Sequence, residues 1–274
     1  MSLFVCPVCS APLTREERSY RCPAGHSYDI AREGYVHLLP ANKKHSANPG
    51  DDREMVASRT RFLDGGWYAP LRDALCRLAL AHTGDCPAVL DAGCGEGYYT
   101  NGIFSALQNA GKSPHVAGVD LSKLALRKAA RRTPGAEFAV ASVYHLPVAD
   151  RSIDLLVDCF APLALEEYRR VLKPGGMFLY VVPAPNHLIE LKSVLYEQPY
   201  LNTEEAVAYE GFDYVEIIPV TALMAIGDSQ PLMDLFGMTP YAWKTPRAGV
   251  ERLAALSGLD VTMDFRVHVF RRQG

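Results

Sequence analysis

The sequence has no stretch of about 18 consecutive apolar residues, the length that a membrane-spanning helix requires. Its first residues also lack the basic segment, apolar segment and cleavage site of a secretory signal. Neither sign of charge dominates, because the 274 residues carry a formal net charge of −3. The overall charge therefore gives no indication of a polyanionic partner. No internal repeat is visible. We therefore expect a cytoplasmic protein with no membrane partner, large enough for one large domain and one small one.

The cysteines are few and unevenly placed, with three of the seven in the first 22 residues. Such clustering without an export signal favours metal over disulfides. Cys6 and Cys9 form one short pair, and Cys22 with His26 forms a second, which together supply the four donors of a tetrahedral zinc site. A redox Cys-x-x-Cys is the alternative, but it leaves Cys22 and His26 unexplained. Residues 1–40 are thus predicted to be a small zinc-binding module of the ribbon or knuckle type, and the closed ligand set predicts a structural metal.

A polar stretch rich in turn-forming residues follows this module, and residues 41–60 are predicted to be a linker and lead-in helix. Lys43, Lys44 and His45 are candidate phosphate contacts, although a solvated loop explains them equally well. The apolar spacing predicts helices over 52–63 and 68–81, the first of which stops at a glycine pair. We expect both helices to cover a sheet.

From residue 88 the pattern alternates strand, turn and helix, which argues for a parallel sheet with crossover helices. The predicted strands are 89–91, 116–119, 138–141, 153–158 and 177–182, and the predicted helices include 98–109, 123–132 and 165–172. The basic residues of 123–132 are interpreted as a solvated helix face, with an RNA surface as the alternative. Near the end, residues 261–269 alternate apolar and polar side chains, which predicts a half-buried antiparallel edge strand.

The first strand of this series runs into a glycine-rich turn, with glycines at alternate positions 93, 95 and 97. Glycine adopts positive φ and lets a ligand approach the backbone closely. Asp120 ends the second strand, where a carboxylate can accept hydrogen bonds from ribose hydroxyls. Tyr98 occupies the place of a third glycine in a dinucleotide fingerprint, which disfavours a dehydrogenase. A structural turn in an unrelated α/β domain remains an alternative.

The acidic residue before the glycine turn, Asp120 and the Leu-Lys-Pro-Gly-Gly sequence at 172–176 occur together. In combination they resemble class I S-adenosylmethionine-dependent methyltransferases from about residue 88 to residue 182. The resemblance implies an α/β fold with a Rossmann-like seven-stranded sheet, the glycine loop at the methionine end of the cofactor, and the ribose on Asp120. The cofactor-binding residues that it implies in this region are Asp91, Gly93, Cys94, Gly95, Glu96, Gly97, Tyr98, Asp120, Leu121 and Ser142.

Over the whole chain, an ordered set of short motifs narrows the resemblance. The set comprises the four zinc-ligand positions, Glu33-Gly34-Tyr35-Val36, Pro49-Gly50-Asp51, the motif at 62–71, the glycine turn, Phe160-Ala161-Pro162, Pro183-x-Pro185-x-His187-Leu188 and Met238-Thr239-Pro240-x-Ala242-Trp243. It closely resembles the RlmA family of 23S rRNA guanine-N1 methyltransferases, and more its Gram-negative branch. That resemblance implies a zinc module that helps to bind an RNA hairpin, a methyltransferase domain over 61–274, a homodimer, and Tyr68 and His187 beside the methyl donor.

Methylation at guanine N1 releases a proton, and a proton acceptor is expected near the strand ends. Asp158 and His145 are the candidate catalytic residues, with His187 or a water as alternatives; an aspartate at 158 is not part of the family pattern. Phe160, Tyr241 and Trp243 are candidates for stacking on an extruded base, against a core role for each.

Three functions therefore follow from the sequence. The first is methyl transfer from S-adenosylmethionine to N1 of a guanine in a hairpin loop of 23S rRNA. The second is methylation of a small molecule, with the zinc module acting only as a lid. The third is a non-catalytic RNA-binding adaptor on a methyltransferase fold, which the intact cofactor motifs disfavour.

Overall fold

A computed structural model describes residues 2–40, 52–204 and 208–274. Within them, one sheet of eight strands forms the centre of the molecule, and its strand order is β10-β11-β9-β8-β5-β6-β7-β4. The strands are β4 (Tyr35–His37), β5 (Ala88–Ala92), β6 (His115–Asp120), β7 (Glu137–Val140), β8 (Ile153–Cys159), β9 (Leu172–Pro183), β10 (Phe212–Ile226) and β11 (Leu259–Arg272). The seven strands of the class I methyltransferase fold are present, and β4 extends their sheet.

The sheet is mixed, because strands β4 to β9 run parallel whereas β11 is antiparallel to both β9 and β10. The prediction of an edge strand over 261–269 was therefore wrong: β11 lies inside the sheet, and β10 forms the edge. Of its alternating polar residues, Asp264 and His268 are buried and hydrogen-bonded, while Thr262 and Arg266 are partly exposed. Asp264 accepts a hydrogen bond from the Thr221 hydroxyl at 2.8 Å, and His268 Nδ1 lies 2.8 Å from the Tyr214 hydroxyl.

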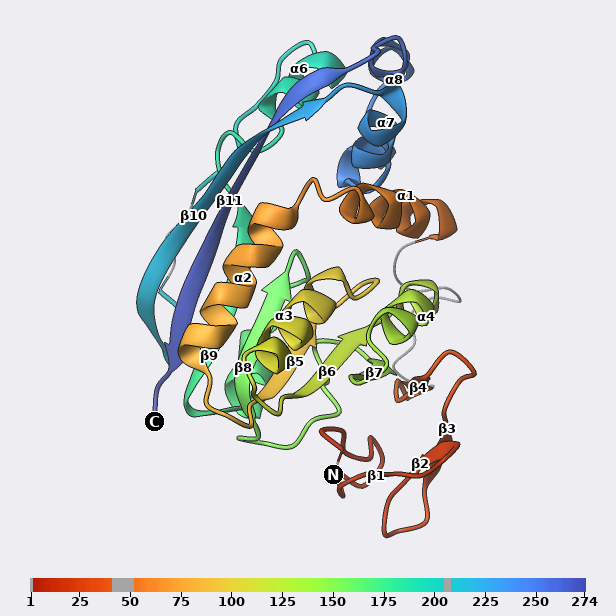
Figure 1. Ribbon diagram of the computed structural model, residues 1–274, viewed down its shortest axis with the longest axis vertical. Coiled ribbons are helices and arrows are strands. Elements are labelled where there is room, and N and C mark those ends of the chain that lie inside the picture. Colours follow the sequence, from red (N-terminus) through yellow and green to blue (C-terminus); the bar gives the residue numbers. More distant parts are fainter. Residues whose placement is uncertain (1, 41–51, 205–207) are drawn as a thin grey trace.

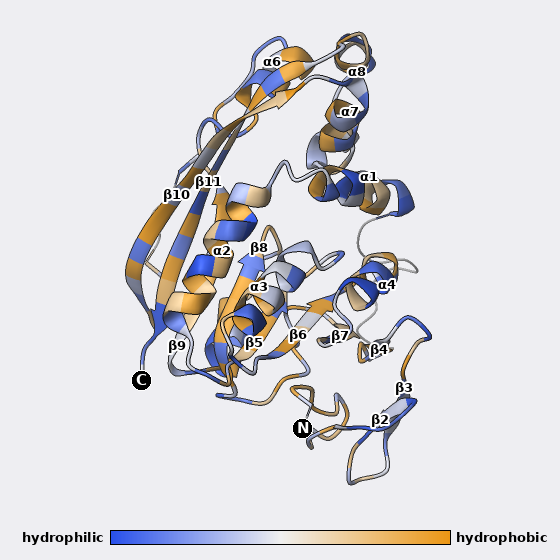
Figure 2. Cartoon of the chain, in the orientation of Figure 1, coloured by the Kyte–Doolittle hydropathy of each residue, from blue (hydrophilic) through white to orange (hydrophobic). Residues whose placement is uncertain are grey.

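Helices cover both faces of the sheet and gather at one of its ends (Figure 1). They are α1 (Arg53–Asp64), α2 (Ala69–His82), α3 (Tyr98–Asn109), α4 (Lys123–Arg132), α5 (Leu165–Val171), α6 (Ile189–Leu195), α7 (Ser229–Gly237) and α8 (Arg247–Ala254), with a 3₁₀ turn, η2, over Pro240–Trp243. The central strands are mostly hydrophobic, while β10 and β11 alternate along their length (Figure 2). In the described residues, no helix combines the length and apolar character needed to cross a membrane.

The N-terminal residues form a small sheet, with β1 (Thr14–Arg15), β2 (Ser19–Arg21) and β3 (Ser27–Asp29), that packs against the large one. Phe4, Leu13 and Tyr20 are buried in the same core as residues of α5 and the central strands. The Tyr20 hydroxyl donates a hydrogen bond of 2.8 Å to Glu137 on β7, and β4 pairs with β7 in parallel. The predicted linker positions Lys43, Lys44 and His45 lie outside the described residues, as do residues 49–51 of the Pro-Gly-Asp motif.

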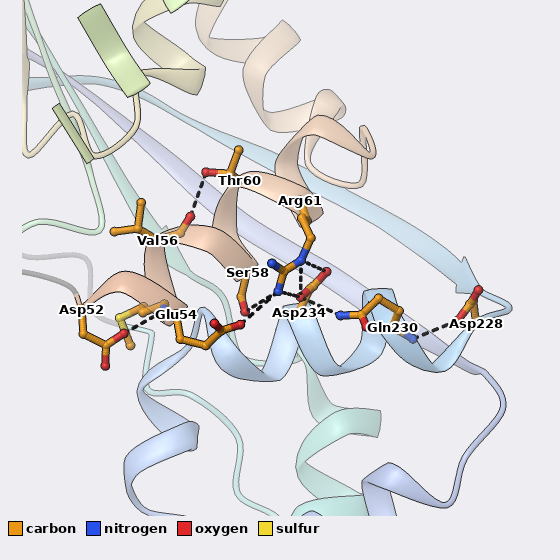
Figure 3. Close-up of polar contacts among 10 residues, drawn as sticks. Asp52, Glu54, Val56, Ser58, Thr60, Arg61, Asp228, Gln230 and Asp234 are labelled. Atoms are coloured by element: carbon orange, nitrogen blue, oxygen red, sulfur yellow. Dashed lines mark hydrogen bonds and ion pairs between the residues drawn. The ribbon is translucent and has the colours of Figure 1, made fainter. Parts of the chain in front are cut away.

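Helices α1 and α7 pack together above the carboxyl ends of the parallel strands (Figure 1). Their contact centres on Arg61, whose guanidinium donates to both carboxylate oxygens of Asp234, the shortest of these bonds being 2.6 Å (Figure 3). The same guanidinium reaches Glu54 and the Ser58 hydroxyl, each at 3.2 Å. A buried acid on one helix and a cation on the other thus join two segments that are 173 residues apart.

Candidate functional site

A cavity of about 1020 Å³ opens at the carboxyl ends of β5, β6, β7, β8 and β9, and residues of α1 and η2 also line it. Ligands bind at this end of open α/β sheets because the strand order reverses there. Small-molecule pockets are typically about 300–1,000 Å³, so this one is at the upper limit of that range. It has room for a cofactor together with part of a second molecule.

The glycine loop between β5 and α3 forms one wall of the cavity. Gly93, Gly95 and Gly97 all have positive φ, of 80°, 54° and 79°. A Cβ atom on Gly93 would lie 2.3 Å from the Cβ of Ala161, so no other residue fits at this position without displacing its neighbour. Asp120 braces the loop, because its two carboxylate oxygens accept hydrogen bonds from the backbone N–H groups of Gly95 and Ser122, at 2.9 and 2.7 Å.

Eleven of the twelve predicted cofactor residues line this cavity: Tyr68, Asp91, Gly93, Cys94, Gly95, Glu96, Tyr98, Asp120, Leu121, Ser142 and His187. Gly97 is the one predicted cofactor residue that does not line the cavity formed by the described residues. A Cβ on Gly97 would lie 2.9 Å from Cα of Ala129, so this glycine allows α4 to pack closely against the loop. This contact assigns Gly97 to helix packing, whereas the sequence predicted that it binds the cofactor.

Two buried polar side chains next to the glycine loop have unused hydrogen-bonding capacity within the described residues. The Tyr99 hydroxyl is fully buried, lines the cavity and has no hydrogen-bond partner there. Glu96 is ion-paired with Arg132 at 3.0 Å, but neither of its carboxylate oxygens makes a hydrogen bond. Burial raises the pKa of Glu96, and Arg132 opposes that shift. Unpaired buried polar atoms are costly, so their position at the loop fits a polar ligand such as the amino-acid end of S-adenosylmethionine.

His187 and Tyr68 form a second wall together with Phe265. The Tyr68 hydroxyl lies 3.5 Å from His187 Nε2, and the rings of His187 and Phe265 have centroids 4.2 Å apart. Burial lowers the pKa of His187 to about 3, with Lys192 adding to the shift. Its Nδ1 accepts the backbone N–H of Asp264 at 3.3 Å, so in the neutral ring the proton is on Nε2. An uncharged ring at this wall does not repel a cationic sulfonium.

The predicted zinc ligands come together in the N-terminal module. The ligand atoms of Cys6, Cys9, Cys22 and His26 lie within 4.8 Å of one another. Zinc–sulfur bonds of about 2.3 Å and zinc–nitrogen bonds of about 2.0 Å in a tetrahedron place ligand atoms roughly 3.5–3.8 Å apart. The observed separations are 3.7 Å between the sulfurs of Cys9 and Cys22, and 3.5 and 3.3 Å from His26 Nδ1 to the sulfurs of Cys6 and Cys22. The donor set and its spacing therefore fit a structural zinc ion.

The comparisons with known proteins agree with both parts of the chain. The protein-family model described as "RlmA, N-terminal", a zinc ribbon, matches residues 4–47. A second family model, described as "Methyltransferase domain", matches residues 89–176. The 23S rRNA (guanine(748)-N(1))-methyltransferase of Streptomyces fradiae is 35% identical over 97% of this chain and 95% of its own length. The chain belongs to the RlmA family of 23S rRNA guanine-N1 methyltransferases.

A second relative supports the assignment to the RlmA family, and a solved structure supports the fold. YxjB of Bacillus subtilis is 33% identical over 96% of the chain and 95% of its own length. The crystal structure of a methyltransferase candidate from Bacillus halodurans superimposes with a TM-score of 0.50 at 14% identity, over 74% of this chain and 99% of that one. It supports the fold alone. The closer likeness to Gram-negative members remains a prediction.

Neither predicted catalytic residue of the RlmA-family chain lines the cavity that the described residues form. Asp158 is buried, and its carboxylate accepts hydrogen bonds from the Ala161 N–H and the Tyr168 hydroxyl. His145 belongs to the turn after β7, where its N–H donates to the Ser142 carbonyl. Neither residue is thus part of the cavity wall, although His145 is exposed next to Tyr144, which lines it. The catalytic role of both residues remains a prediction.

Several residues that line the cavity were not predicted from the sequence. Tyr99 directly follows the predicted Tyr98, but a helix-initiating tyrosine carries no pattern that distinguishes a core role from a ligand contact. Phe265 lies on the strand that was mistaken for an edge. Arg59 lines the cavity from α1 and donates to the Met238 carbonyl at 3.3 Å. These residues come from segments far apart in sequence, so only the tertiary structure brings them to the site.

Proposed function

We propose that this chain transfers a methyl group from S-adenosylmethionine to N1 of a guanine in a hairpin loop of 23S rRNA. The observation that carries the proposal is that one cavity combines two kinds of lining. The glycine loop and Asp120 are suited to the donor. The same cavity is lined by large aromatic side chains that remain accessible: Tyr144, Phe160 and Trp243 are 54%, 47% and 68% exposed.

Accessible aromatics beside a cofactor pocket suit an extruded base. Guanine N1 takes part in Watson–Crick pairing, so the enzyme must act on a loop base or remove one from its stack. Stacking on an aromatic side chain compensates for the stacking that the base loses, by about 1–3 kcal/mol. A small, rigid metabolite would not need three exposed rings at the cavity entrance, so this arrangement favours RNA over the small-molecule alternative.

In methyl transfer, the main task of the protein is to align the acceptor with the methyl donor. S-adenosylmethionine supplies an electrophilic methyl group, and the residues of the cavity hold the acceptor in line with it. We propose that the eleven lining residues named above bind the donor. His187 does not act as a base in this proposal, because its Nδ1 already accepts a backbone hydrogen bond. We propose that a water in the cavity, one of the predicted acceptors, takes the N1 proton.

The remaining assignments belong to the same proposal. The zinc module, over residues 1–40, would contribute to RNA binding, and Arg15, Arg18 and Arg21 are exposed on it. The methyltransferase domain would occupy residues 61–274, after a linker and lead-in helix at 41–60. A homodimer would complete the RNA-binding cleft, and an rRNA substrate implies action in the cytoplasm.

The test is to incubate the protein with labelled S-adenosylmethionine and unmodified 23S rRNA, and then to map any methylated position. Label at N1 of a single hairpin-loop guanine supports the proposal. Label that enters a small-molecule extract but not RNA favours the second function. A protein that binds RNA and cofactor without any turnover is the adaptor.

A further inference from the structure

We infer that Asp158 is a positioning residue, whose buried carboxylate holds the turn after β8 so that the ring of Phe160 faces the cavity and supports the target base. This inference rests on the proposed function, because it assigns Phe160 the role of the stacking platform. It replaces the prediction that Asp158 accepts the N1 proton.

Phe160 has an unusual backbone conformation. Its φ is +68°, in the left-handed region that is unfavourable for a bulky side chain. Strained residues persist only where their surroundings hold them, and they concentrate at functional sites. The ring of Phe160 lines the cavity, is half-exposed, and has its centroid 5.1 Å from that of Phe265. The strain therefore places a large apolar surface in a position where a ligand can cover it.

Asp158 supplies the hydrogen bonds that hold this turn. One carboxylate oxygen accepts the backbone N–H of Ala161 at 2.9 Å, directly after Phe160. The other oxygen accepts the hydroxyl of Tyr168 on α5 at 2.8 Å. Tyr168 is itself buried and packs edge-on against Phe178, with ring centroids 5.2 Å apart. The carboxylate is thereby tied to the core on one side and to the turn on the other.

The opposite side of the turn rests on the cofactor loop. Because Ala161 occupies the space that a Cβ on Gly93 would need, the turn and the loop are in direct contact. The turn is consequently held between the Asp158–Tyr168 pair and the glycine loop. Such an arrangement fixes the platform for the acceptor relative to the donor, and small misalignments of reacting groups are costly in rate.

A catalytic base at this position would need a free carboxylate oxygen directed into the cavity. Both oxygens of Asp158 are engaged, and the residue does not line the cavity formed by the described chain. Burial raises the pKa of Asp158 to about 7, which would suit a base, but the geometry gives the base no path to the substrate.

The Asp158→Asn variant separates the two roles. Its amide oxygen can still accept the Ala161 N–H and its amide nitrogen can donate to Tyr168, so we expect kcat within about tenfold of wild type, from weaker hydrogen bonds, and an unchanged pH profile. Loss of a general base would instead lower kcat by about 10²–10⁴-fold. Asp154→Asn is the matched control, because Asp154 lies on the same strand but is ion-paired with Lys173.

A double-mutant cycle then tests whether Asp158 acts through Phe160. Asp158→Ala is expected to raise KM for RNA and lower kcat while S-adenosylmethionine binding stays near its wild-type value. Phe160→Gly removes the ring and tolerates positive φ. In the Phe160→Gly background, Asp158→Ala should have little further effect, since no ring remains to be positioned. Fully additive effects in this cycle would overturn the inference.

A crystal structure of Asp158→Ala supplies a result that does not depend on RNA. We expect Phe160 to leave the left-handed region and its ring to leave the cavity. An unchanged Phe160 would refute the positioning role, whatever the substrate. If Asp158→Ala does not fold, the Asp158→Asn kinetics still decide. A wild-type protein that methylates no RNA would refute the proposed function, while the crystal structure would still test the turn.

Discussion

The ion pair between α1 and α7 offers a quantitative test of how the cavity is closed. The Asp234 side chain is 4% exposed, whereas those of its partner Arg61 and the neighbouring Glu54 are 47% and 80% exposed (Figure 3). Arg61→Ala leaves a buried carboxylate without its cation. Removing one partner of a fully buried pair costs about 3–5 kcal/mol, and because Arg61 is half-exposed and screened by water, we expect about 2 kcal/mol.

This loss should be visible in two assays. In thermal unfolding, about 2 kcal/mol corresponds to a Tm decrease of roughly 4–8 °C for a protein near this size. In a binding titration, S-adenosylmethionine affinity should fall as well, since Met55 on α1 and Met238 after α7 both line the cavity. Asp234→Asn combined with Arg61→Ala should recover part of the stability, because no charge is then left buried.

Glu54→Gln is the control, because it changes the exposed partner of the same arginine. An exposed ion pair contributes about 0–1 kcal/mol, so its Tm should stay near that of wild type. Equal effects of Glu54→Gln and Arg61→Ala, or an Arg61→Ala variant as stable as wild type, would show that burial of Asp234 does not determine the energy of this contact.

Four further predictions follow from the site. The purified protein should contain one zinc ion per chain by elemental analysis, and Cys22→Ala should lose it; folded wild-type protein without metal would contradict the ligand assignment. Gly93→Ala should abolish cofactor binding in a titration, because its Cβ has no space, whereas Gly84→Ala, where a Cβ meets open space, should bind normally. Tyr99→Phe should leave Tm unchanged but weaken S-adenosylmethionine binding by up to about tenfold, the effect of one hydrogen bond, and equal affinity would exclude that contact. Burial lowers the pKa of His187 to about 3, below its value in the unfolded chain, so the neutral ring contributes to stability above pH about 6.5 and this contribution is lost as the pH falls towards 3. In urea titrations, a His187→Gln variant should therefore lose less stability than wild type over this pH range. Identical pH dependences of the two proteins would count against the lowered pKa.

Local patterns predicted much of the methyltransferase fold. Helices α3 and α4 have the bounds expected from the sequence, because a glycine turn and the Ser122 cap mark where they begin. In the structure, the Ser122 hydroxyl accepts the N–H of Ala125 at 3.3 Å and so caps α4. Parallel strands buried on both faces are continuous apolar runs, and such runs are recognisable without knowledge of their partners.

The errors arose where distant segments decide the environment. The alternation in β11 is typical of a strand with one face in solvent. In the structure β10 pairs along β11, and its Thr221 and Tyr214 are hydrogen-bond partners of Asp264 and His268. No strand was predicted over β10, whose Pro219 argues against a central position; the structure places this strand at the edge, where proline is tolerated. Asp158 was interpreted from its place at a strand end, whereas its orientation depends on Tyr168, ten residues away on α5.

The pairing of β4 with β7 has a consequence for how the protein is handled in the cell. The outer edge of β7 would otherwise present unpaired backbone groups, and such edges are templates for aggregation. The N-terminal module covers this edge and also buries Phe4 and Tyr20 against the sheet. Zinc starvation should therefore affect more than RNA recognition. Without zinc the N-terminal module would unfold and expose the edge of β7, and newly synthesised enzyme would aggregate before it could act.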